Sequence, residues 1–83
     1  MKIEDLLEEA KFYFVSQKYD LAEKFFKEVL KKEPGNKEAL FNLALLYEVT
    51  NQFDQAKEYF ERVLQVDPSN KEARDHLDKL TEL

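Results

Sequence analysis

The chain carries few of the residue types that perform chemistry, and those few are not spaced for it. His76 is the single histidine, and its sequence neighbours Arg74 and Asp78 are charged but add no second histidine or cysteine. Ser16 and Ser69 have no histidine partner, and one glycine cannot build a phosphate-binding loop. The absence of cysteine excludes disulfides, thiol catalysis and cysteine zinc sites. We therefore predict that the protein is not an enzyme, binds no metal or cofactor, and exposes His76 to solvent.

Length and composition indicate one small, highly helical domain over residues 1–83. Of these residues, 43% are apolar and 37% are charged, as in ordinary soluble proteins. No apolar run approaches the ~20 residues that span a bilayer, and the acidic N-terminus is unlike a signal peptide, so we expect a cytoplasmic protein. The net charge of −5 disfavours nucleic acid and anionic membranes, because phosphate contacts need clustered lysine and arginine. The expected partner is a protein or peptide.

Residues 39–49, which read ALFNLALLYEV, are the stretch that the rest of the chain must surround. As a helix this segment is apolar on almost every side, with only Asn42 and Glu48 polar. Such a helix is stable only when neighbours cover several of its faces. We therefore expect helices on both flanks.

Those flanking helices are supplied by an internal repeat. Residues 3–36 align on residues 37–70 without a gap, and 12 of the 34 paired positions are identical. A third copy begins at Lys71 and contains one helix. Repetition at this period is typical of stacked arrays, in which each unit completes its core on its neighbour.

The breaks in this pattern predict five antiparallel helices. Turns are expected at residues 17–19, 33–36, 51–53 and 67–70, with the last helix over residues 71–83. Asn36 and Asn70 are predicted N-caps of the third and fifth helices. Asp20, in a capping box with Glu23, and Asp54 are predicted N-caps of the second and fourth.

The repeated residues resemble the tetratricopeptide repeat signature. The second copy carries it as Leu40, Leu43, Ala44, Tyr47, Ala56, Phe60 and Pro68, and the first copy as Leu6, Ala10, Tyr13, Ala22, Phe26 and Pro34. The resemblance covers nearly the whole chain. It implies an all-α solenoid with repeat 1 at 3–36, repeat 2 at 37–70 and a capping helix at 71–83. The family's glycine is missing from both inner turns, where Asn51 tolerates a left-handed conformation better than Gln17 does.

The two ends depart from the repeat in a way that predicts terminal surfaces. Where the middle helix has the apolar stripe Ala39, Leu43 and Leu46, the first helix has Asp5, Glu9 and Phe12. In the last helix, Arg74 and Asp78 replace the apolar residues that would meet a following helix. Terminal elements of solenoids need polar outer faces, so we expect a complete two-repeat array.

By the same resemblance, the first helix of each repeat lines a concave groove that family members use to bind extended peptides or partner helices. The corresponding partner-binding positions are Leu7, Lys11, Phe14, Glu38, Phe41, Asn42, Leu45, Glu48 and Val49. Some family members hold chaperone C-terminal carboxylates with lysine, arginine and asparagine in this groove. Here only Asn42 matches, since the other positions are Leu7, Lys11, Glu72 and His76. A clamp without its cations would repel a carboxylate. An apolar or amphipathic partner with some basic residues is predicted instead.

Three alternatives stay open on the sequence alone. The apolar faces could pair with a second copy of the chain as a homo-oligomerisation module. The chain could also be an idealised or engineered repeat scaffold with no dedicated ligand. Finally, the last helix could fold partly over the groove, or the phenylalanine and leucine of the groove could serve only repeat-to-repeat packing.

Overall fold

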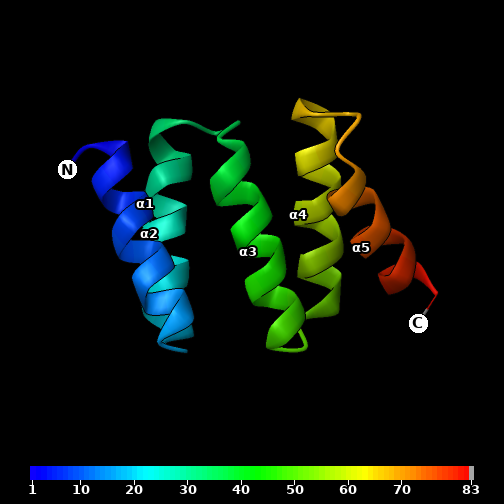
Figure 1. Cartoon of the computed structure of the whole chain (residues 1–83), viewed down its shortest axis with the longest axis horizontal. Coiled ribbons are helices and arrows are strands. Elements are labelled where there is room, and N and C mark those ends of the chain that lie inside the picture. The colour runs from blue at the N-terminus through cyan, green and yellow to red at the C-terminus, as the bar shows by residue number, and fades with distance from the viewer. Residues whose placement is uncertain (83) are drawn as a thin grey trace.

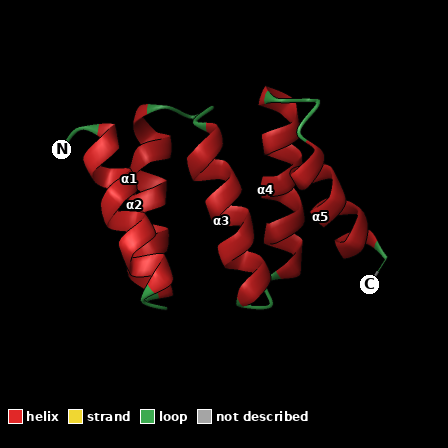
Figure 2. Ribbon diagram, viewed as in Figure 1, coloured by secondary structure: helices red, strands yellow, loops and turns green. Residues whose placement is uncertain are grey.

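The computed structural model describes residues 1–82, and within this range five α-helices follow one another with no strand. They are α1 Ile3–Val15, α2 Tyr19–Lys32, α3 Lys37–Val49, α4 Phe53–Val66 and α5 Lys71–Thr81. Successive helices are antiparallel and form two hairpins followed by a single helix, which confirms the predicted all-α solenoid (Figures 1 and 2). The predicted last helix extends to Leu83, which lies outside the described residues. None of the described helices is long and apolar enough to cross a membrane.

The helix starts confirm two of the predicted caps and correct the other two. The side chains of Asn36 and Asn70 accept hydrogen bonds from the Ala39 and Ala73 amides, at 2.9 and 2.8 Å. The predictions for Asp20 and Asp54 were wrong. In α2 and α4 the N-cap residues are Lys18 and Gln52, which make no side-chain cap, and the two aspartates lie inside the first turn.

The reason for the earlier start is the way that α1 and α3 end. Gln17 and Asn51 adopt left-handed conformations, with φ of 62° and 63°. The next amides, of Lys18 and Gln52, then donate to the Tyr13 and Tyr47 carbonyls at 2.8 Å, which is the Schellman ending of a helix. Because this tight ending reverses the chain at once, the following helix begins two residues after the left-handed residue.

The middle helix α3 is buried on more of its surface than any other described helix. Its buried residues are Ala39, Leu40, Leu43, Ala44, Leu46 and Tyr47. It packs on α4 within its own hairpin and on α2 of the preceding one, whereas α1 makes its main contacts with α2 alone. The core of each hairpin is thus completed by the other, as expected for stacked repeats.

Small residues and phenylalanines fill the closest contacts. Ala10, Ala22, Ala44 and Ala56 have no solvent exposure, which is what the close approach of paired helices requires. Phe26 and Phe60, at the same position of the two repeats, are also fully buried and occupy the interior of the core.

One polar group is built into the contact between the hairpins. Tyr47 is almost fully buried, and its hydroxyl donates a hydrogen bond to the Glu23 carboxylate of α2. Lys27 lies 3.2 Å from the same carboxylate. Burial, and then the bond to Glu23, raise the pKa of Tyr47 above its usual range. Glu23 therefore stabilises the packing of α3 on α2 and does not form the predicted capping box.

We expect Asn36→Ala to lower the free energy of unfolding by about 1 kcal/mol, because it removes a capping bond. Asp20→Ala is the matched control, and it should cost only about 0.3–0.5 kcal/mol, since Asp20 acts only through the helix dipole. Urea denaturation measures both variants. An equal loss in the two would contradict the cap assignment.

Tyr47→Phe should cost about 1–2 kcal/mol at neutral pH, because it removes a hydrogen bond to a charged group. The raised pKa also gives a pH dependence. The contribution of neutral Tyr47 is fully present below about pH 10, the unfolded value, and is lost as the pH rises above it. Melting curves from pH 8 to 11 should therefore fall less steeply for Tyr47→Phe than for the wild type. Tyr19→Phe serves as the control, and an equally steep fall in Tyr47→Phe would refute the assignment.

Candidate functional site

The candidate site is the inner face of the solenoid, which we define as the side formed by α1, α3 and α5. In Figure 1, α1 is drawn in front of α2 and α5 in front of α4, with α3 between the two pairs. Two hollows open on this face. The first, of about 330 Å³, lies between α1 and α3 and is lined by Glu4, Asp5, Leu7, Glu8, Lys11 and Glu38. The second, of about 230 Å³, lies between α3 and α5 and is lined by Lys37, Glu38, Phe41, Asn42, Asn70 and Glu72.

The structure places part of the predicted groove in these hollows. Leu7 and Lys11 line the first, Phe41 and Asn42 line the second, and Glu38 belongs to both. Phe14, Leu45, Glu48 and Val49 lie outside the two lining sets. Whether a partner binds these nine positions stays a prediction.

The apolar members of the groove are less exposed than the sequence suggested. The half-buried residues that pack against the core are Leu7, Phe14, Phe41 and Leu45. Val49 is different, because 55% of it is exposed. The inner face therefore shares most of its apolar side chains with the core.

Lys11 and Glu38 connect the inner sides of α1 and α3. The Lys11 amine lies 2.7 Å from the Glu38 carboxylate, and about half of each side chain is exposed. An exposed pair of this kind contributes only about 0–1 kcal/mol to stability. Its main consequence is that the one lysine of the first hollow already has a carboxylate partner.

His76 corrects a prediction. The sequence indicated a solvated surface histidine, but its ring stacks on Phe60 at 5.0 Å and meets the edge of Phe41 at 6.1 Å. Its Nδ1 atom is buried and lies 3.0 Å from the Glu48 carboxylate, without the geometry of a hydrogen bond. His76 therefore attaches α5 to the inner side of α3. The sequence left open that the last helix covers part of the groove. At Phe41 it does, through the contact with His76 of α5.

Three residues of the second hollow, Lys37, Asn70 and Glu72, were missed by the sequence analysis as binding positions. Glu72 and Asn70 line it from the start of α5. The repeat contained the signal, because Lys71-Glu72-Ala73 matches Lys37-Glu38-Ala39 one period earlier. Any groove position on α3 predicts its counterpart on α5.

The charge of the inner face is predominantly negative. Glu38 and Glu72 flank the second hollow, and the lysine in its lining, Lys37, lies 3.1 Å from the Asp67 carboxylate. Hydrogen bonds from Lys37 and Asn70 hold the pKa of Asp67 below its usual range. Lys37 is thus engaged by Asp67, and Glu38 by Lys11. The hollow therefore combines an aromatic wall with the carboxylate of Glu72, which favours a cation.

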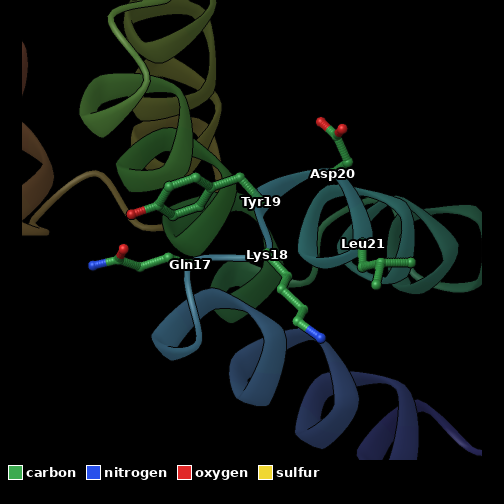
Figure 3. A pocket seen from close by; sticks show the side chains of 5 residues that line it. All are labelled: Gln17, Lys18, Tyr19, Asp20 and Leu21. Atoms are coloured by element: carbon green, nitrogen blue, oxygen red, sulfur yellow. The ribbon is translucent and has the colours of Figure 1, made fainter.

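A larger hollow, of about 440 Å³, lies at the turn between α1 and α2 and makes a poorer site. Its lining residues are Gln17, Lys18, Tyr19, Asp20 and Leu21. Figure 3 shows that Lys18, Asp20 and Leu21 point in different directions. Polar groups that diverge cannot bind one ligand together, so the inner face remains the stronger candidate.

Comparisons with known proteins agree with this geometry. The Tetratricopeptide repeat family pattern matches residues 14–80. The solved structure "First TPR of Spaghetti (RPAP3) bound to HSP90 peptide SRMEEVD" superposes with a TM-score of 0.90 at 23% sequence identity. The match covers 98% of this chain but only 64% of that one. No curated protein sequence matches the chain.

We expect Phe41→Glu to remove several kcal/mol of stability, because it places a carboxylate against the buried ring of Phe60. Leu45→Glu should be similarly costly, since Leu45 packs on the core. Val49→Glu is the matched control and should change the melting temperature little, because this side chain is mostly exposed. Thermal unfolding by circular dichroism measures all three. A Phe41→Glu protein as stable as Val49→Glu would show that the Phe41 side chain is not part of the core.

Proposed function

Because the chain belongs to the tetratricopeptide repeat family, we propose that it is a protein-interaction module whose inner face binds a peptide or a partner helix. The observation that carries this proposal is the second hollow, which Phe41 lines together with Glu38 and Glu72. The peptide bound to the similar TPR domain of RPAP3 supports a peptide as the class of ligand.

The chemistry of the face favours a partner with apolar and basic residues. The alkyl part of a lysine or arginine can lie on Phe41 while its charge approaches Glu38 or Glu72. The peptide of the similar structure, SRMEEVD, has the opposite character at its acidic end. We expect such a peptide to be repelled here, because Glu72 and His76 stand where the family's carboxylate clamp needs cations.

The expected affinity is weak. A face formed by three short helices buries less than the ~1,200 Å² typical of stable complexes, which corresponds to roughly micromolar binding. Weak binding is also consistent with the half-buried state of Phe41 and Leu45, since little apolar surface is left for a partner.

The proposal is tested with two fluorescein-labelled peptides of equal length, one with alternating leucine and lysine and the other SRMEEVD. The basic peptide should bind, and the double variant Glu38→Lys and Glu72→Lys should weaken it by about tenfold or more. The double variant Glu58→Lys and Glu61→Lys, on the exposed side of α4, is the control for net charge and should weaken it much less. Fluorescence anisotropy measures each affinity.

Tighter binding of SRMEEVD than of the basic peptide would overturn the charge argument. Equal losses in the two double variants, which change the net charge by the same amount, would show that only net charge matters. Light scattering on the same samples tests the alternative of self-association, which requires an oligomer in the absence of peptide.

A further inference from the structure

A second surface lies at the opposite end of the solenoid from α5, on the first hairpin. We define this N-terminal face by Asp5, Glu9, Phe12, Tyr13 and Phe25. Asp5 and Glu9 are exposed, and 62% of Phe12 is exposed, although phenylalanine is usually buried. None of these five residues is among the nine predicted groove positions, although Asp5 also lines the first hollow of the inner face.

Comparison of α1 with its counterpart in the second repeat, α3, indicates which kind of element covers a face of this composition. The residues of α3 that correspond to Asp5, Glu9 and Phe12 are Ala39, Leu43 and Leu46, and all three are buried. Both α1 and α3 pack on the second helix of their own hairpin, but only α3 also packs on α2 of a preceding hairpin. We attribute the burial of these three α3 positions, whose counterparts are exposed in α1, to the α2 helix that covers α3.

The aromatic rings of the N-terminal face are already arranged as in the covered copy. Tyr13 stacks on Phe25 at 5.7 Å, as Tyr47 packs against Tyr59 at 5.4 Å in the second repeat. Phe12 meets the edge of Tyr13 at 5.5 Å. Because these contacts already hold the rings in place, the side chains would lose little conformational entropy when a partner binds.

We propose that the N-terminal face binds an amphipathic helix of another protein, in the manner in which α2 covers α3. The helix presents a carboxylate to the Tyr13 hydroxyl, as Glu23 does to Tyr47. It places apolar residues on Phe12 and lysine or arginine opposite Asp5 and Glu9, which replace the alanine and leucine of α3. This partner differs from the inner-face ligand, because it needs an acidic residue among its basic ones.

Charge favours a foreign helix over a second copy of the chain. Asp5 and Glu9 are both negative, and the face also meets one cation at Phe25, where the Lys24 amine lies 6.0 Å from the ring centre. In a symmetric dimer the same patch faces itself, so the carboxylates are in excess on both sides. A helix with lysines of its own removes that excess.

The α2 sequence itself supplies a suitable probe, residues 19–32, YDLAEKFFKEVLKK, which contains Glu23 and four lysines. The probe is synthesised with a lactam staple that holds it helical, and is titrated into the intact ¹⁵N-labelled protein. We expect saturable amide shifts on α1 between residues 5 and 13, with a dissociation constant of roughly 10–100 µM. A scrambled peptide of the same composition should produce none.

Matched variants separate this face from the inner face. Phe12→Glu should weaken probe binding by about tenfold or more, and Tyr13→Phe should weaken it by a smaller factor through loss of the hydroxyl bond. Val49→Glu, an exposed apolar position of the inner face, should leave probe binding unchanged. Melting curves verify that each variant is folded.

Three results would overturn the proposal. The first is probe binding that is absent up to about 1 mM, a concentration at which even weak specific contacts are populated. The second is amide shifts that fall on α3 and α5 and respond to Val49→Glu. The third is a wild-type dimer that Phe12→Glu converts to a monomer, because the face would then belong to a second copy.

Discussion

The double-sided burial of α3 is the constraint on which the rest of the structure depends. This helix has to be covered by α2 on one side and α4 on the other, because apolar residues occupy nearly all of its surface. Among the described residues, α1 buries two side chains and α2, α4 and α5 bury three each, so no other helix contributes as much to the core. Two hairpins that shared no such helix would each be too small to be stable alone.

Sharing the core between repeats also couples recognition to stability. Phe41 lies on the inner face, yet its ring packs on Phe60 and His76, which belong to α4 and α5. A side chain of this kind contributes to the core through one side and, in the proposed function, to the binding surface through the other. The exposed charges Glu38 and Glu72 have no such double role. Selectivity for a partner can therefore change through the charges while the packing stays the same.

The inner face and the N-terminal face show two ways in which one repeat geometry produces different surfaces. On the inner face, neighbouring helices bring side chains together across a hollow, as Lys11 and Glu38 do. On the N-terminal face, residues that are apolar in the second repeat become Asp5 and Glu9, while Phe12 and the Tyr13–Phe25 stack keep the aromatic character. The helix bounds and the left-handed residues recur at the same positions of both repeats, and the substituted positions give the two faces their different character.

The sequence by itself determined the helices, their order and their packing positions. A pattern of alanine, aromatic and leucine positions that repeats every 34 residues is compatible with few other folds. The sequence also determined the Asn36 and Asn70 caps, which act within three residues. Tertiary structure alone decided the roles of Glu23 and His76, whose partners Tyr47 and Phe60 lie 24 and 16 residues away on other helices. Tertiary structure also decided that Phe41 and Leu45 are half-buried. Local spacing shows which face a side chain is on, but how far a neighbouring helix covers that face depends on the assembled packing.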